Sequence, residues 1–249
     1  MTDRRFIRAL ALSRPVPAGS YIADLPAVKW LQAAGTLPFP AAVTLLCGEN
    51  GTGKSTVLEA LAVAVGFNAE GGSRHFRFST AATHSPLCEC VTVQRQDYER
   101  DGFFLRAESF YNAATYLQQL DEQPAAAPPL ADSYGGRSLH EHSHGESFMA
   151  LVEHRLGGRG LYLFDEPEAA LSPARQLELM VHIRRLVKDG SQFVIATHSP
   201  ILLGYPDACI YEFSCAGIAR TAWKDTMHYR LTRRFLERPE ALLSELFEE

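Results

Sequence analysis

The chain has 249 residues, of which 46% are hydrophobic and 21% are charged, so it can bury a full core within about one large domain. Its formal net charge of −5 excludes a protein that coats nucleic acid or anionic lipid over its whole surface. No apolar run approaches the roughly 18 residues of a membrane span, so we expect a cytoplasmic protein without a membrane segment. The five cysteines match neither a disulfide framework nor a metal knuckle, and we expect reduced thiols.

The N-terminal third predicts an antiparallel β-layer ahead of the core. Residues 5–12 alternate in a pattern that favours a strand, and residues 28–35 favour a short helix. Further along, the alternation in "CECVTVQRQD" is typical of an exposed strand. We therefore expect a small sheet that faces solvent on one side.

A phosphate-binding loop lies between these segments. Residues 43–47 are typical of a buried strand, and residues 55–65 favour a helix that ends at Gly66. The stretch between them, "GENGTGKST", satisfies the motif G-x-x-x-x-G-K-[ST] in the strand–loop–helix context that this motif requires. The residues expected to bind phosphates are Gly48, Glu49, Asn50, Gly51, Thr52, Gly53, Lys54, Ser55 and Thr56.

The spacing of this loop has a physical reason. Glycines let the backbone wrap closely, so that several N–H donors converge on the phosphates, and the helix N-terminus adds partial positive charge. Lys54 is expected to neutralise the β- and γ-phosphates, Ser55 to ligate Mg²⁺, and Thr56 to reach the α-phosphate. The alternative interpretation is an ordinary glycine turn before a helix.

Two later strands end in polar residues. Residues 161–164 are apolar and are followed by Asp165 and Glu166, which we expect to hold Mg²⁺ and to act as general base on the attacking water. The strand in "SQFVIATHSP" ends near His198, a candidate γ-phosphate sensor. In parallel sheets these carboxyl ends share one edge, where ligands bind. A pair of carboxylates that only caps its strand, and a structural histidine, are the alternatives.

The order of these motifs, a phosphate loop followed by "SHGES", "LYLFDEP" and "IATHS", resembles the ABC-type ATPase superfamily over most of the chain. The stretches "DGFFLRAESFYNAATYL", "DEPEAALSP" and "QFVIATHSPILL" are similar to small stand-alone bacterial predicted ATPases of the AAA/ABC type. The resemblance implies an α/β P-loop NTPase fold with a mainly parallel core sheet, an antiparallel β-layer and a helical lobe. It also implies heads that dimerise with ATP between them.

The stretch "SLHEHSHGESF" aligns with the family's signature L-S-G-G-Q, which contacts the nucleotide of the opposite subunit. The resemblance puts Ser143 on the serine, Gly145 on the second glycine and Glu146 on the glutamine. Two histidines replace the family's leucine and first glycine, which puts the close backbone approach in doubt at one position.

Two further assignments rest on weaker patterns. The alternating His140, His142 and His144 leave a metal site or a plain solvated loop open as alternatives, although no cysteine or distant carboxylate cluster completes a metal site. The resemblance also suggests that Glu108 takes the metal-and-water position that a glutamine fills in the family. The loop "AALS" after the acidic pair departs from the transporter-like S-A-L-D and favours a soluble head.

We expect residues 1–249 to form one domain, with the core and β-layer in about 1–107 and 158–249 and the helical lobe in 108–157. Ser172 as N-cap and Pro173 at the first position predict a helix through Lys188 that Gly190 closes. The acidic end "ERPEALLSELFEE" predicts a terminal helix with a solvated face. The apolar stripe expected in the core consists of Leu177, Met180, Ile183 and Val187.

These assignments predict hydrolysis of ATP to ADP and phosphate by an ATP-sandwiched head-to-tail dimer. The preference for ATP rests on the resemblance and on the lack of an N-K-x-D guanine motif. One alternative is a regulatory module in which ATP closes a dimer that grips a partner, with slow turnover. Another is the energising subunit of a transporter. A protein or nucleic-acid partner is left open.

Overall fold

The computed structural model describes residues 5–17, 19–73, 85–106 and 144–247. Its centre is a six-stranded sheet in which β5, β6, β7, β3 and β8 run parallel and the edge strand β9 is antiparallel. The strands, in the order of the sheet, are β5 (Asp101–Arg106), β6 (Gly160–Asp165), β7 (Gln192–Ala196), β3 (Val43–Gly48), β8 (Cys209–Ser214) and β9 (Gly217–Thr221). The predicted fold class, an α/β fold with a mainly parallel core sheet, is confirmed.

The central strands are buried on both faces, as their near-continuous apolar sequences predict. Every residue of β3, β6 and β7 is buried. Alternate residues of β3 enter different hydrophobic clusters: Leu46 packs into one, whereas Leu45 and Cys47 pack into the other. The sheet therefore separates two cores.

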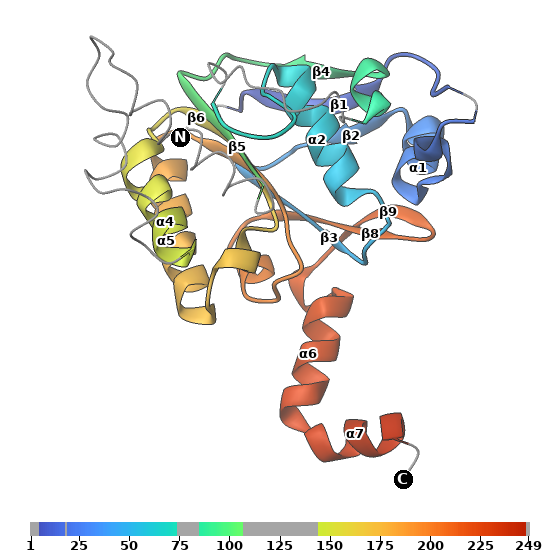
Figure 1. Ribbon diagram of the computed structural model, residues 1–249, viewed down its shortest axis with the longest axis vertical. Coiled ribbons are helices and arrows are strands. Elements are labelled where there is room, and N and C mark those ends of the chain that lie inside the picture. Colours follow the sequence, from blue (N-terminus) through green and yellow to red (C-terminus); the bar gives the residue numbers. More distant parts are fainter. Residues whose placement is uncertain (1–4, 18, 74–84, 107–143, 248–249) are drawn as a thin grey trace.

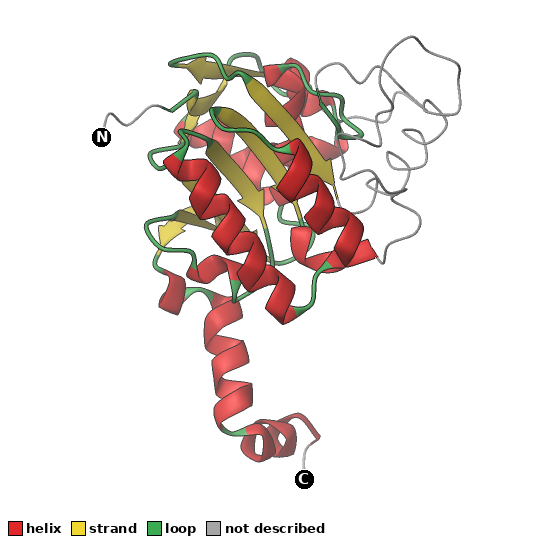
Figure 2. Cartoon of the chain, turned by 90° about the vertical axis from the view of Figure 1, so that its left-hand side faces the viewer, coloured by secondary structure: helices red, strands yellow, loops and turns green. Residues whose placement is uncertain are grey.

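Helices cover both faces of this sheet (Figures 1 and 2). On one face, α1 (Pro26–Ala34) and α2 (Lys54–Val65) contribute to the first cluster. On the other face, α4 (His144–Ala150), the π-helix Leu151–Arg155 and α5 (Pro173–Lys188) contribute to the second. Helix α2, which follows the phosphate loop, and helix α4, which begins at the signature stretch, thus lie on opposite faces of the sheet.

The predicted antiparallel layer is a three-stranded sheet in the order β2 (Thr36–Pro38), β1 (Ile7–Leu12) and β4 (Val91–Arg95). The buried Gln192 side chain of β7 ties it to the core. Its Oε1 accepts from the backbone N–H groups of Phe6 and Ile7 at 2.8 and 3.0 Å, and its Nε2 donates to the Ile7 carbonyl at 3.0 Å. A buried amide with its polar atoms paired fixes the register between the two sheets.

The cap predicted for α5 is confirmed, because Ser172 accepts a hydrogen bond from the Arg175 N–H. The predicted core stripe was wrong at Leu177, whose exposed fraction is 56%. Met180 and Val187 flank the core, half-buried, and only Ile183 of that stripe is fully buried. The face that packs on the sheet consists of Gln176, Leu179, Ile183 and Leu186.

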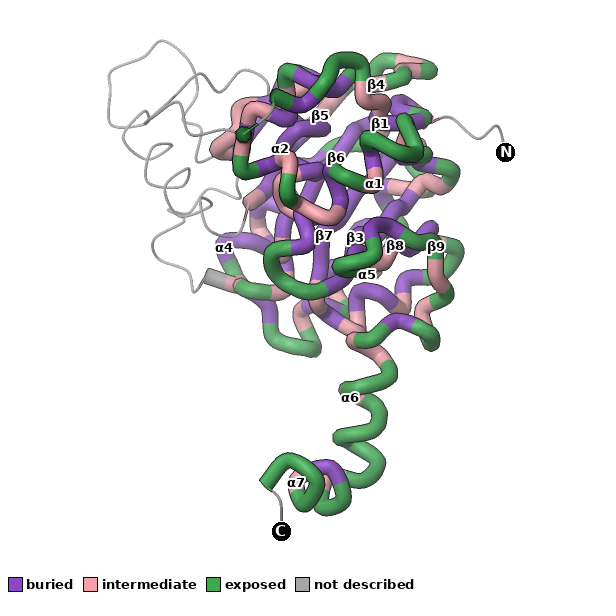
Figure 3. The backbone as a smooth tube through the Cα atoms, turned by 90° about the vertical axis from the view of Figure 1, so that its right-hand side faces the viewer, coloured by how far each residue is buried: buried purple, intermediate pink, exposed green. Residues whose placement is uncertain are grey.

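The chain ends in an arm formed by α6 (Met227–Glu237) and α7 (Pro239–Phe247), which projects away from the body (Figures 1 and 3). No residue of α6 is buried. Arg234 on α6 pairs with Glu245 on α7 through contacts of 2.5 Å. The predicted solvated terminal helix is confirmed.

The sequence predicts reduced cysteines and no membrane-spanning segment. All five cysteines fall in the described part and carry free thiols. Within the described ranges, no helix combines the length and the apolar character that a bilayer crossing needs.

Candidate functional site

The loop between β3 and α2 brings its backbone against the neighbouring strand. Gly48 has a φ of 130°, and a Cβ at this position would lie 2.0 Å from the Phe213 carbonyl oxygen of β8. Only glycine can occupy a position with so close a backbone approach. The first glycine of the motif is therefore required by packing as well as by the turn.

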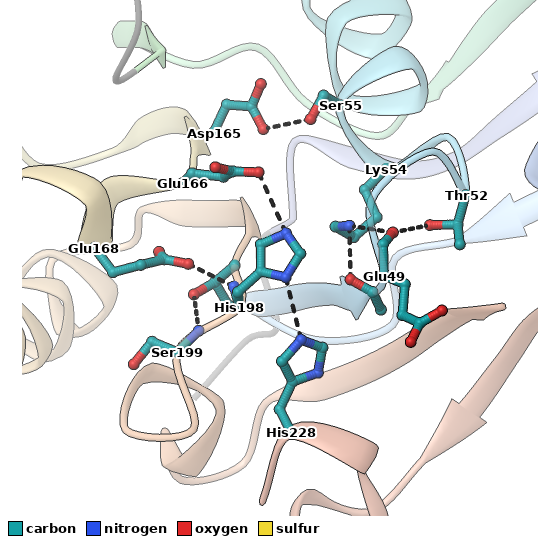
Figure 4. Close-up of polar contacts among 12 residues, drawn as sticks. Glu49, Thr52, Lys54, Ser55, Asp165, Glu166, Glu168, His198, Ser199 and His228 are labelled. Carbon is teal, nitrogen blue, oxygen red and sulfur yellow. Dashed lines mark hydrogen bonds and ion pairs between the residues drawn. The ribbon is translucent and has the colours of Figure 1, made fainter. Parts of the chain in front are cut away.

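Lys54, the first residue of α2, lies inside this loop and is only 4% exposed. Its Nζ donates to the carbonyls of Gly48 and Glu49 at 2.7 and 2.8 Å, while Thr52 Oγ1 donates to the Glu49 carbonyl at 2.8 Å (Figure 4). Burial lowers the pKa of Lys54, and the Glu166 and Asp165 carboxylates oppose that shift. An ammonium group is thus held at the centre of a loop built to receive anions.

Asp165, at the carboxyl end of β6, is 7% exposed and accepts a hydrogen bond from Ser55 Oγ at 3.0 Å (Figure 4). Sequence reasoning paired these two residues as metal ligands, and the fold brings them together. Hydroxyl and carboxylate oxygens are the hard donors that Mg²⁺ prefers. This donor pair therefore fits a magnesium ion bound beside the phosphate loop.

Arg106 and Glu59 extend this polar cluster and were missed from the sequence. Arg106 Nε lies 3.8 Å from Asp165 Oδ2, and its Nη1 lies 2.6 Å from Glu59 Oε2. Glu59 also accepts from the Ser85 N–H at 2.7 Å. A glutamate within the otherwise apolar run of α2 was a usable signal, because a buried carboxylate requires a partner.

Glu166 follows β6 directly and has left-handed backbone angles, φ 51° and ψ 53°. Its N–H donates to the Ala196 carbonyl at 2.9 Å, which fixes the turn against β7. Its side chain is 42% exposed, and its Oε1 lies 3.3 Å from His198 Nε2. Non-glycine residues in this region are strained, and such strain clusters at functional sites.

His198 lies just beyond β7 and is held from several directions. Its backbone N–H donates to Glu168 Oε1 at 2.5 Å, and its ring Nδ1 lies 3.1 Å from His228 Nε2 (Figure 4). The ring Nε2 is buried and makes no well-aligned hydrogen bond with another described residue. A buried polar atom without such a bond needs an explanation, and a ligand at this edge of the sheet provides one. Glu168 and His228 were not predicted from the sequence.

Gly145 and Glu146 lie near the start of α4 and not beside α2. A Cβ on Gly145 would lie 2.8 Å from the Ala170 carbonyl oxygen, so the start of α4 packs against the loop that follows Glu166. Ser143, Glu108, His140 and His142 lie outside the described residues.

A buried lysine in a glycine loop, joined at one sheet edge by an acidic pair and a histidine, defines a P-loop nucleotide-binding domain. Two family models agree with this class. An "AAA domain" model matches residues 29–122, and a model described as "AAA domain, putative AbiEii toxin, Type IV TA system" matches residues 147–204.

Curated proteins are similar to part of the chain. The chain is 26% identical over 195 residues to the ribose import ATP-binding protein RbsA of Jannaschia sp. (strain CCS1), a match that covers 70% of this chain and 36% of the relative. It is 26% identical over 166 residues to the nucleoside import ATP-binding protein NupA of Lactococcus lactis subsp. cremoris (strain MG1363), covering 61% of this chain and 32% of the relative. The chain thus spans about a third of the length of these relatives.

Solved structures share the fold. The ATP-binding cassette MJ1267 of an ABC transporter superimposes with a TM-score of 0.51 at 15% identity, covering 96% of this chain and 98% of that one. A nucleotide-free ATP-binding cassette from an ABC transporter superimposes with a TM-score of 0.50 at 16% identity, covering 88% and 92%. The motifs, the sequence matches and this shared fold together support a P-loop ATPase of the ABC type.

Proposed function

We propose that the chain hydrolyses ATP to ADP and phosphate, with Mg²⁺, between two copies arranged head to tail. The observation that carries this proposal is the convergence of a phosphate loop, an acidic pair and a histidine at one edge of a parallel sheet (Figure 4). This proposal divides the sequence into a nucleotide-binding core in about 1–107 and 158–249 and a lobe that carries the signature in about 108–157.

The side chains divide the chemistry among them. Ser55 and Asp165 hold Mg²⁺, which when bound supplies positive charge to the phosphate oxygens. Lys54 neutralises charge on the β- and γ-phosphates, because its ammonium group is fixed inside the loop. Glu166 accepts the proton of the attacking water, and His198 contacts the γ-phosphate.

The arrangement of the helices supports a dimer. The start of α4, with Gly145 and Glu146, lies on the face of the sheet opposite to α2 and packs beside the loop after Glu166. From this position, the signature stretch of one copy contacts the γ-phosphate of the nucleotide bound by the second copy. The nucleotide then lies between Lys54 of one copy and Ser143 of the other.

The names of the curated relatives favour a second candidate function. Both relatives described above are import ATP-binding proteins, so the chain is alternatively the energising part of a transporter that docks on a membrane partner. The ATP-driven regulatory module, with a protein or nucleic-acid partner, uses the same dimer. Stimulation of phosphate release by a co-purified partner distinguishes these roles from constitutive turnover.

A pair of substitutions tests the dimer. Glu166→Gln keeps the shape of the site but removes the basic oxygen, so this variant should bind Mg-ATP without cleaving it and accumulate as a dimer. Adding Ser143→Arg should abolish the dimer while each monomer still binds ATP. Light scattering coupled to size exclusion, with and without Mg-ATP, measures both states.

The matched control is His182→Gln in the Glu166→Gln background, since His182 lies on α5 and pairs with Glu153, outside the site. This control should leave the ATP-dependent dimer intact. A Glu166→Gln variant that stays monomeric with ATP bound, or a dimer that survives Ser143→Arg, would contradict the head-to-tail arrangement.

A further inference from the structure

A second histidine contacts His198 from the C-terminal arm. His228, in the first turn of α6, places its Nε2 3.1 Å from His198 Nδ1, and the two ring centroids are 5.2 Å apart (Figure 4). His198 in turn places its other nitrogen 3.3 Å from Glu166 Oε1. The three side chains form a row that runs from Glu166 after β6, through His198 after β7, to His228 on α6.

Hydrogen bonds fix the turn that carries His228 to strand β8 and to the loop after β7. Thr226, fully buried, caps α6 by accepting from the Tyr229 N–H. The Met227 N–H donates to Glu212 Oε1 on β8 at 2.8 Å. Just before the helix, Trp223 Nε1 donates to the Pro200 carbonyl at 3.0 Å, two residues beyond His198. The core therefore determines the position of the His228 ring, although no residue of α6 is fully buried.

The partners of the two rings determine their tautomers. An ionised carboxylate only accepts, so Glu166, 3.3 Å away, favours the neutral His198 tautomer that carries its proton on the facing nitrogen, Nε2, although the two atoms do not form an aligned hydrogen bond. His198 Nδ1 then has a free lone pair, and the Nε2–H of His228 donates to it. Burial lowers the pKa of His228, the neighbouring His198 and Lys54 act in the same direction, and the Glu212 and Glu49 carboxylates oppose them; the net shift favours the neutral ring.

We propose that His228 is a positioning residue for the hydrolysis. It holds His198 in the Nε2–H tautomer and keeps that N–H on the Glu166 side of the ring, where the proposed function places the γ-phosphate. This inference rests on the proposed function, because it assigns His198 to the γ-phosphate. It adds a contact through which the C-terminal helices take part in the ATP site. The arm thereby becomes part of the catalytic apparatus without touching the nucleotide.

The proposal predicts a selective kinetic effect. His228→Leu removes the donor and leaves His198 free to change tautomer and to rotate. Phosphate release should slow about 10- to 100-fold in kcat, by analogy with the loss of outer partners that orient metal-bound imidazoles. The KM for ATP should change less than about twofold, because the phosphate loop carries the binding. His228→Gln should restore most of the rate, since its amide also donates from Nε2.

A readout that does not depend on activity is the nitrogen NMR spectrum of the His198 ring. The wild-type protein should show the Nε2–H tautomer, and His228→Leu should give a mixture of tautomers. His182→Gln is the matched control and should change neither the His198 signals nor kcat. An unchanged His198 spectrum in His228→Leu, or a His228→Gln variant as slow as His228→Leu, would overturn the proposal.

A double mutant separates this inference from the proposed function. If both hold, His198→Ala is slow, and adding His228→Leu slows it no further, because the two residues act as one unit. If His198→Ala hydrolyses ATP at the wild-type rate, the proposed role of His198 is wrong. If His198→Ala is slow while His228→Leu alone is fast, the proposed function stands and the positioning role is wrong.

Discussion

Replacing Glu166 by glycine should give a protein that is more stable than the Glu166→Ala variant and that hydrolyses ATP much more slowly than the wild type. A non-glycine residue at φ 51° and ψ 53° carries a left-handed penalty of about 1–2 kcal/mol, which glycine does not pay. The greater freedom of glycine in the unfolded chain offsets about 0.4–1 kcal/mol of that gain. The net stabilisation relative to Glu166→Ala is about 1 kcal/mol, which raises the melting temperature by about 2–4 °C in a chain of this size.

Glu166→Ala is the matched control, because it removes the same carboxylate but keeps the strained backbone. Both variants should release phosphate about 10²- to 10⁴-fold more slowly than the wild type, the usual contribution of a general base. Thermal unfolding without nucleotide and a phosphate-release assay measure the two effects. A glycine variant that melts no higher than the alanine variant would refute the strain argument. Near-wild-type phosphate release in either variant would remove Glu166 as the base.

Three further outcomes are expected. Lys54→Ala should abolish measurable triphosphate binding in calorimetry, because charge-assisted hydrogen bonds worth roughly 1.5–3 kcal/mol each are lost; wild-type affinity would contradict the phosphate-loop assignment. Ser55→Ala should raise the Mg²⁺ concentration needed for half-maximal phosphate release, because Asp165 loses its hydroxyl partner; an unchanged Mg²⁺ titration would exclude Ser55 as a ligand. In the folded protein near pH 8, a maleimide should label the exposed Cys215 and spare Cys47, whose pKa burial raises to about 12; peptide mass mapping that finds Cys47 labelled equally would disprove this.

The parts of the site that the sequence predicted are those that follow from local structure and simple sheet geometry. The phosphate loop is contiguous, so its glycines, Lys54 and Ser55 are readable from spacing alone. Asp165 and His198 come from different strands, but the carboxyl ends of parallel strands share an edge. Their meeting therefore needed only the correct sheet type.

The parts that could not be predicted depend on which distant elements pack together. His228 looks like an ordinary histidine at the start of an exposed helix, and only the fold places its ring against His198. Glu168 likewise supports the His198 backbone across two loops. On α5, the helix's own apolar residues lie on several of its sides. More than one apolar stripe therefore fits the 3.6-residue period, and the prediction at Leu177 was wrong for this reason.

The projecting arm has a mechanical consequence. The 11 residues of α6 span about 16 Å, so a rotation of about 15° in the turn that carries His228 moves the far end of the helix by about 4 Å. If the anchored turn rotated in this way, the arm would pivot near the histidine pair and carry the exposed Leu246 and Phe247 with it. A rotation of that size at the turn would move the end of α6 by about three quarters of the 5.4 Å pitch of an α-helix.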